Sequence, residues 1–172
     1  MRAQLAHPLD GRYGAMDTST LNEHIRRLLD ATPLDGIDFV LGIPEGGTAP
    51  AFAFAHEAGL PLVLASRFDN EAPGTIYFRE PHNEPGADRF TIHGLGQGDR
   101  VLLVEDEITT GHTIVDCVRS LRAAGVAIDA VASLFAIDSP AMRERLDAER
   151  IALTVGQWLP VALLAEVGVE NP

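Results

Sequence analysis

Two adjacent carboxylates, Glu105 and Asp106, have the surroundings of a ligand site. Four apolar residues, Val101–Val104, precede them, and the loop Thr109-Thr110-Gly111-His112-Thr113 follows and leads into an amphipathic helix. Carboxylates accept hydrogen bonds from vicinal hydroxyls, and amides at a helix N-terminus favour phosphate. A sugar phosphate satisfies both halves, with its ribose on the acid pair and its 5′-phosphate on the loop. The alternative is a buried strand that ends in solvated acids ahead of a helix.

A second loop, Pro44-Glu45-Gly46-Gly47, also lies between an apolar run and a helical pattern. Paired glycines allow backbone amides to approach an anion closely, and the helix N-terminus behind them adds a favourable dipole. The loop is therefore a candidate pyrophosphate site, although glycines at this place also occur for packing reasons. Arg67 is a further candidate for the same anion because its fork of donors suits phosphate oxygens. Its alternative is a solvated surface arginine.

The hydrophobic pattern predicts strands that alternate with helices. We expect helices at 19–31, 48–58, 112–124 and 140–150, and strands at 37–43, 60–65, 101–104, 126–137, 151–155 and 158–164. Such alternation predicts one α/β domain over residues 1–172, with a doubly wound, mainly parallel sheet flanked by helices. Ligands of such sheets bind at the carboxyl ends of the strands, where both loops would then lie.

Composition limits the partners of the chain. The 172 residues carry a net charge of −12, which argues against nucleic acid or an anionic membrane as the partner and favours a cationic one. All 13 basic residues are arginine, so no lysine is available as a Schiff base or general base. The single cysteine, Cys117, excludes an internal disulfide and is expected in the core. We see no signal peptide or membrane span and expect a cytoplasmic protein.

The segment from Val101 to Thr113 resembles the phosphoribosyl-pyrophosphate signature of the type I phosphoribosyltransferases, in which an apolar strand leads to an acidic pair and then to Thr-Thr-Gly or a close variant. Gly46–Ala51 is similar to the family's pyrophosphate loop and helix start. The resemblance covers roughly Ile37 to Ala136 and is closest to the orotate- and adenine-type branches. Glu107 departs from it, because the family usually has an aliphatic residue there.

The resemblance implies further parts of the fold. A flexible lid would cover residues 70–88, with the segments at 77–79 and 89–92 as the arms of a hairpin and with Arg79, His82 and Glu84 as candidate lid residues. A small hood would form from the N-terminal segment and the C-terminal strands. Trp158 resembles part of that hood over the acceptor, although a single tryptophan is more often a packing residue. The family resemblance also implies a homodimer.

The activity implied is transfer of the 5-phosphoribosyl group from phosphoribosyl pyrophosphate to a nucleobase or a specialised acceptor, with release of pyrophosphate. Glu105 and Asp106 would be the catalytic residues. Magnesium would be the cofactor, and Asp106 would contact it indirectly, through the ribose hydroxyls or water. Two alternatives stay open, namely a regulatory protein that senses the sugar phosphate without catalysis and a transferase acting on an amine or hydroxyl acceptor outside nucleotide metabolism.

The residue at position 109 bears on the acceptor. Enzymes of this family that act on 6-oxopurines usually have an aspartate there, which exchanges a proton with the purine N7, and this chain has Thr109. A hydroxyl cannot perform that exchange near neutral pH, whereas a tuned carboxylate can. We therefore expect an acceptor other than hypoxanthine or guanine. Orotate-specific members carry lysines near the lid, which this chain lacks.

Overall fold

The structure is a computed structural model, which describes residue 9 and residues 14–68, 72–79 and 89–163. In chain order the elements are α1 (Thr18–Asp30), β1 (Phe39–Gly42), α2 (Thr48–Ala58), β2 (Leu62–Leu64), β3 (Ile76–Arg79), β4 (Arg89–Ile92), β5 (Arg100–Ile108), α3 (His112–Ala123), β6 (Ala127–Ile137), α4 (Pro140–Ala148) and β7 (Ala152–Leu159). Among these described residues, no helix is long and apolar enough to cross a membrane.

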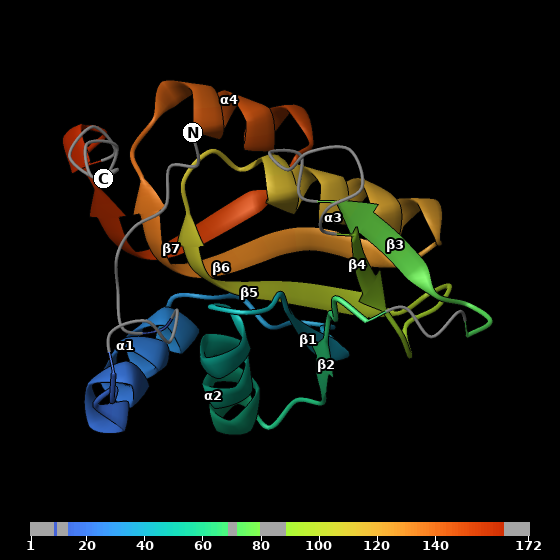
Figure 1. The fold of residues 1–172 in the computed structure, drawn as a ribbon, viewed down its shortest axis with the longest axis horizontal. Coiled ribbons are helices and arrows are strands. Elements are labelled where there is room, and N and C mark those ends of the chain that lie inside the picture. The colour runs from blue at the N-terminus through green and yellow to red at the C-terminus, as the bar shows by residue number, and fades with distance from the viewer. Residues whose placement is uncertain (1–8, 10–13, 69–71, 80–88, 164–172) are drawn as a thin grey trace.

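The main sheet has five strands in the order β2-β1-β5-β6-β7. Every neighbouring pair runs parallel. Helices α1 and α2 cover one face and α3 and α4 cover the other (Figure 1). The prediction of a mainly parallel, doubly wound sheet is confirmed.

Strand β5 is the centre of the molecule because it is buried on both faces. Leu102 and Val104 pack in the cluster under α1 and α2, whereas Val101 and Leu103 pack in the cluster under α3 and α4. A strand covered on both sides needs apolar residues at every position, which explains its uninterrupted apolar run. Full burial of each such side chain stabilises the fold by about 1.5–3 kcal/mol.

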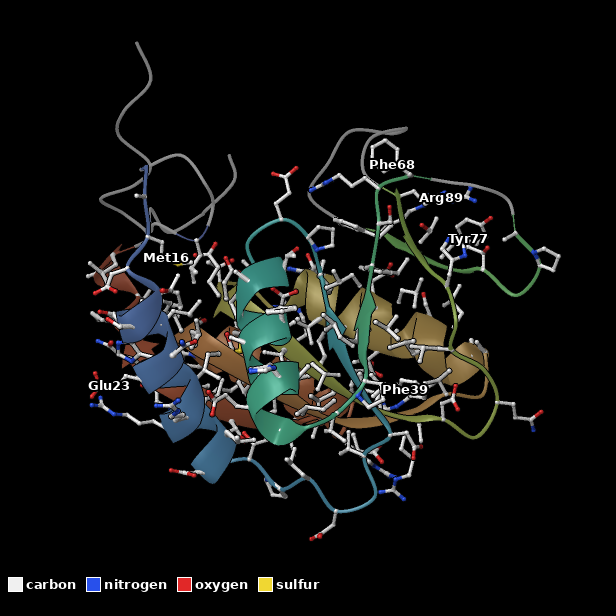
Figure 2. The ribbon with its side chains drawn as sticks, turned by 90° about the horizontal axis from the view of Figure 1, so that it is seen from below. Met16, Glu23, Phe39, Phe68, Tyr77 and Arg89 are labelled. Atoms are coloured by element: carbon white, nitrogen blue, oxygen red, sulfur yellow. The ribbon has the colours of Figure 1, made fainter. Side chains whose placement is uncertain are left out.

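Helix α1 begins as its sequence predicts. The Asp17 side chain accepts a hydrogen bond from the backbone N–H of Ser19 at 2.9 Å and caps the helix. Leu21, Ile25 and Leu28 then recur at helical spacing and are buried against the sheet. Seen from below, α1 and α2 lie side by side in front of the sheet (Figure 2).

The end of the sheet differs from the prediction of two short strands at 151–155 and 158–164. A single strand, β7, runs through Gly156 and keeps its register with β6 from Ala152 to Leu159. A Cβ atom at Gly156 would stand 3.0 Å from the Leu134 carbonyl oxygen, so glycine permits the close approach that keeps the strand continuous. Glycine often interrupts a strand, but here its lack of a side chain allows the β6 backbone to come close and the strand to continue.

Strands β3 and β4 form a separate antiparallel hairpin, as predicted for the arms at 77–79 and 89–92. Backbone hydrogen bonds of 2.8 Å in both directions join Thr91 of β4 to Ser66 beyond β2. The backbone N–H of Arg79 donates to the Asp116 carboxylate of α3 at 2.6 Å. Figure 2 shows the labelled Tyr77 and Arg89 together on this hairpin. Residues 80–88 between its arms lie outside the described residues, so the lid stays a prediction.

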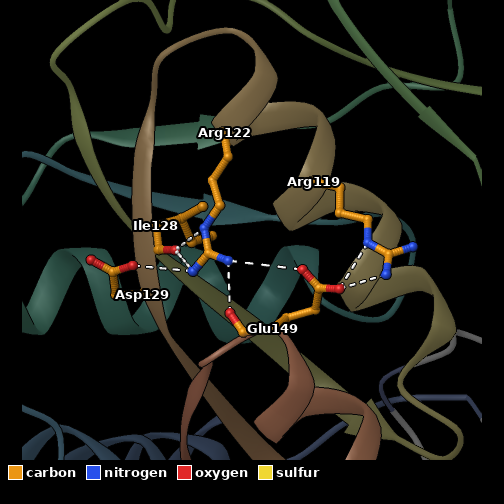
Figure 3. Close-up of polar contacts among 5 residues, drawn as sticks. All are labelled: Arg119, Arg122, Ile128, Asp129 and Glu149. Atoms are coloured by element: carbon orange, nitrogen blue, oxygen red, sulfur yellow. Dashed lines mark hydrogen bonds and ion pairs between the residues drawn. The ribbon is translucent and has the colours of Figure 1, made fainter.

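Two arginines of α3 hold the C-terminal end of α4 (Figure 3). Arg122 donates to the carbonyl oxygens of Ile128 and Glu149, both at 2.7 Å, and Arg119 donates to the Glu149 carboxylate. The Arg119 side chain is 65% exposed, so solvent screens its ion pair and the pair contributes little to stability. The Arg122 contacts are less exposed and satisfy two backbone carbonyls, so they fix α4 more firmly.

Candidate active site

The two loops singled out in the sequence meet at one point of the sheet. They follow β1 and β5, which are adjacent and parallel. The chain leaves β1 for β2 on one side and leaves β5 for β6 on the other, so the direction of winding reverses between these two strands. Open α/β sheets bind their ligands in the crevice at such a reversal, outside the carboxyl ends of the strands.

The acid pair lies at the carboxyl end of β5 with little contact with solvent. Glu105 is 7% exposed and Asp106 is 8% exposed. Burial, followed by the negative charge of Asp106, raises the pKa of Glu105 well above its usual value. Two buried carboxylates side by side are stabilised by hydroxyl groups that donate hydrogen bonds to them or by a cation.

The paired glycines pack directly against these carboxylates. A Cβ atom at Gly46 would stand 1.9 Å from Oδ2 of Asp106, and one at Gly47 would stand 2.7 Å from Oε2 of Glu105. A Cβ atom at Gly47 would also stand 2.6 Å from the backbone carbonyl oxygen of Ile43, so glycine is required there, whereas a side chain at Gly46 would displace the Asp106 carboxylate. The Pro44–Glu45 peptide bond of the same loop is cis, and Glu45 is exposed. The loop predicted to bind pyrophosphate and the acids predicted to bind ribose therefore pack directly against each other.

The loop after β5 ends at the N-terminus of α3. Gly111 occupies the N-cap position with φ 76° and ψ 1°, and no side chain caps the helix. The first amides of a helix lack carbonyl partners within it and carry partial positive charge, so this end suits an anion. The Thr110 hydroxyl lies 3.0 Å from Nδ1 of His112. Thr109, Thr110, His112 and Thr113 are half-buried around the buried Gly111.

The other predicted residues lie further out. Arg67 is exposed, and its guanidinium lies 4.5 Å from the centroid of the Phe90 ring, which places it against the β3–β4 hairpin. Arg79 ends β3 and is exposed. His82 and Glu84 lie outside the described residues, and their lid role stays a prediction.

Cys117 and Trp158 have structural surroundings. Cys117 is fully buried, as predicted, and burial raises the pKa of its thiol well above the usual value. Trp158 is 36% exposed, and the Arg143 guanidinium of α4 lies 3.8 Å from its ring centroid. That contact favours the packing interpretation of the tryptophan over a place above an acceptor.

Metal binding in the described part of the chain depends on the acid pair. No group of three or more His, Cys, Asp or Glu side chains is arranged there to hold a metal ion. Glu105 and Asp106 do offer the hard oxygen atoms that magnesium prefers. The described residues therefore fit an ion whose other ligands belong to a bound substrate and water.

The raised pKa of Glu105 predicts a pH-dependent stability. The unfolded chain loses this proton near pH 4.5 and the folded chain only at higher pH, so ionisation disfavours the folded state. As pH rises from that value to the folded pKa, the contribution of Glu105 to the free energy of unfolding should fall by up to about 1.4 kcal/mol per pH unit.

Glu105→Gln removes the titrating group, so the variant should gain stability over the wild type across this pH range. Urea unfolding of both proteins between about pH 4 and pH 8 measures the difference, in which the titration of distant groups cancels. A difference that stays constant with pH would contradict the buried state of this carboxyl.

The domain match and the sequence relatives of this chain point to the same family. Residues 17–157 match the phosphoribosyl transferase domain. A hypoxanthine/guanine phosphoribosyltransferase from Methanosarcina barkeri (strain Fusaro / DSM 804) is 30% identical over 129 residues, which are 74% of this chain and 67% of the relative. A protein of the same name from Methanohalophilus mahii (strain ATCC 35705 / DSM 5219 / SLP) is 29% identical over 71% of this chain and 63% of its own length. This chain thus spans about two thirds of these relatives.

Solved structures of the same fold carry other names. An adenine phosphoribosyltransferase from Rhodothermus marinus DSM 4252 matches with a TM-score of 0.67 and 25% identity over 83% of this chain and 81% of its own. An orotate phosphoribosyltransferase from Aeropyrum pernix matches with a TM-score of 0.64 and 21% identity over 90% and 80% of the two chains.

Proposed function

Because the chain belongs to the phosphoribosyl transferase family, we propose that it moves the 5-phosphoribosyl group from phosphoribosyl pyrophosphate to a nucleobase. One observation supports the site most directly. The buried acid pair Glu105–Asp106 packs against Gly46–Gly47 at the reversal point of the sheet, with the uncapped start of α3 behind it. The three parts match the hydroxyls, the pyrophosphate and the 5′-phosphate of one substrate.

Each part has a separate task in the proposed reaction. Glu105 and Asp106 accept hydrogen bonds from the ribose 2′- and 3′-hydroxyls, while the amides of Thr109–Thr113 bind the 5′-phosphate. The amides of Gly46–Gly47 hold the pyrophosphate. Its bond to the anomeric carbon breaks with the electron pair leaving on pyrophosphate, while a nitrogen of the acceptor forms the new bond and gives up its proton to water. The two carboxylates stabilise the positive charge that develops on the sugar.

Magnesium is part of the proposal. When bound, the ion neutralises the pyrophosphate oxygens and so makes pyrophosphate a better leaving group. Asp106 would contact it through the ribose hydroxyls or water. The positive charge would also lower the cost of ionising Glu105, whose pKa is raised in its absence.

The roles of the acid pair can be tested by removing one charge at a time. Asp106→Asn and Glu105→Gln should each weaken binding of phosphoribosyl pyrophosphate with magnesium by about tenfold or more, since a hydrogen bond to a charged group is worth about 1.5–3 kcal/mol. Titration calorimetry measures the affinity, and Asp30→Asn, an exposed acid of α1, is the control.

Unchanged affinity in both site variants would refute these roles. Pyrophosphate release by the wild-type protein with a panel of nucleobases, amines and alcohols separates an enzyme from a sensor. Binding of the sugar phosphate without release for any acceptor would favour the sensor.

The acceptor is the finer part of the proposal. The two sequence relatives are named for hypoxanthine and guanine, whereas the solved structures are named for adenine and orotate. The residue at position 109 favours a different acceptor from the one in the names of the sequence relatives. Thr109 is half-buried at the end of β5 and has no carboxylate to exchange a proton with an oxopurine. We therefore propose a nucleobase other than a 6-oxopurine, although the names of the sequence relatives weigh against this choice.

Measured turnover with different nucleobases tests the choice of acceptor. We expect hypoxanthine and guanine to be poor acceptors, with kcat below about 1 s⁻¹, the lower end of the usual range for enzymes. Thr109→Asp should raise their turnover more than that of adenine, because only the oxopurines gain from a proton-exchanging carboxylate. Measuring pyrophosphate release with each base checks both statements. Wild-type turnover of hypoxanthine or guanine at or above that rate would contradict the argument from Thr109.

We also propose that the protein is a homodimer. Three of the exposed large apolar side chains belong to α2, β2 and the residues just beyond β2, namely Phe52 (63% exposed), Leu64 (42%) and Phe68 (84%). Strand β2 is the edge of the sheet, and exposed apolar residues at an edge favour association. A second copy of the chain would cover them.

The dimer has a direct test. The double variant Phe52→Asp, Phe68→Asp should sediment as a monomer at tens of micromolar protein, whereas the wild type should sediment as a dimer, because two buried charges oppose the contact. Val161→Asp changes an exposed apolar residue elsewhere and should leave the dimer intact. A monomeric wild type would rule the proposal out.

A further inference from the structure

Helix α4 supports the proposed phosphate loop from outside. Met142 and Leu146 lie 3.4 and 3.5 Å from the position of a Cβ atom on Gly111. Between them in the sequence, the half-buried Arg145 donates a hydrogen bond from its guanidinium to the carbonyl oxygen of Thr110. The loop thus rests on two apolar side chains and one cation of the same helix.

The backbone angles of Gly111 give this hydrogen bond a specific effect. Its φ of 76° lies in the left-handed region, which favours glycine. A rotation of the peptide between Thr110 and Gly111 would change this φ and reverse the direction of its C=O and N–H groups. In a planar trans peptide the C=O and N–H groups point in opposite directions. The Arg145 contact with the Thr110 oxygen therefore directs the Gly111 N–H away from α4.

We propose that Arg145 is a positioning residue for the 5′-phosphate, an inference that rests on the proposed function. By holding the Thr110 carbonyl toward α4, Arg145 keeps the Gly111 amide as a donor on the opposite side of the loop, where the phosphate binds. A flipped peptide would present a carbonyl oxygen to the phosphate and repel it. The guanidinium also polarises this peptide, which strengthens its N–H as a donor.

The same helix contains a matched control. Arg143 pairs with Asp138 at 2.9 Å and lies over the ring of Trp158, so its contacts are with the ends of β6 and β7. Replacing Arg143 tests the loss of an arginine that stabilises α4. Replacing Arg145 tests the loss of the arginine that donates to the loop.

The experiment measures binding of ribose 5-phosphate by titration calorimetry. Arg145→Met should raise Kd about tenfold, the size expected for one hydrogen bond to a charged group. Arg145→Lys keeps a charge and a donor and should recover part of that loss, while Arg143→Met should stay within about twofold of the wild type. In turnover, Arg145→Met should raise KM for phosphoribosyl pyrophosphate more than it lowers kcat.

A double-mutant cycle with Gly111→Ala tests the peptide orientation. Alanine disfavours a φ of 76°, so the peptide should flip and Arg145 should lose its acceptor. Arg145→Met should then cost nothing further in the Gly111→Ala background. Full additivity of the two changes would mean that Arg145 acts independently of this peptide, which would overturn the inference.

The outcomes separate the two proposals. A wild-type protein that does not bind ribose 5-phosphate would overturn the proposed function and this inference with it. Equal Kd values for the wild type and Arg145→Met, with clear binding by both, would overturn the inference alone. Equal losses in Arg143→Met and Arg145→Met would also overturn it, because they would show a general effect of helix stability.

Discussion

The contact between the glycine loop and the acid pair constrains the rest of the structure. Gly46 and Gly47 lie so close to Asp106 and Glu105 that a side chain at either position would have to displace a carboxylate. This closeness requires β1 and β5 to be adjacent, parallel and in fixed register. It also requires β5 to be covered on both faces, because a strand exposed on one side could not hold two carboxylates away from solvent. The helices and the strand order satisfy these conditions.

The site lowers the stability of the fold when no ligand is bound. Ionising a buried carboxyl beside a second one is unfavourable, as the raised pKa of Glu105 indicates. Such unfavourable charge is tolerated when neighbouring structure is rigid enough to prevent the loops from moving apart. Here the rigidity comes from the two apolar clusters on β5 and from α4, which Arg122 ties down near Glu149. The same unfavourable charge would favour a ligand that brings hydroxyl donors and a cation.

The described residues form the part of the site proposed to bind the sugar phosphate. Much of the predicted lid and most of the N-terminal part of the predicted hood lie outside those residues, whereas the C-terminal strand predicted for the hood is β7, an edge of the main sheet. Relatives named for different bases share this fold with the chain, which fits a common sugar-phosphate half and a variable acceptor half. Thr109 directly follows β5, and in the proposed function it is the residue of the described site that bears most on the choice of base.

The sequence alone determined the features that depend on neighbours along the chain. The order of apolar strand, Glu105–Asp106, glycine-containing loop and helix is local, and so are the arms of the β3–β4 hairpin. The tertiary structure decided the contacts between distant segments: Arg145 reaches Thr110 across 35 positions, and Asp116 reaches Arg79 across 37. It also decided that β7 continues through Gly156. Local patterns fix backbone conformation and the buried face, whereas long-range partners depend on how whole helices pack, which no short stretch of sequence encodes.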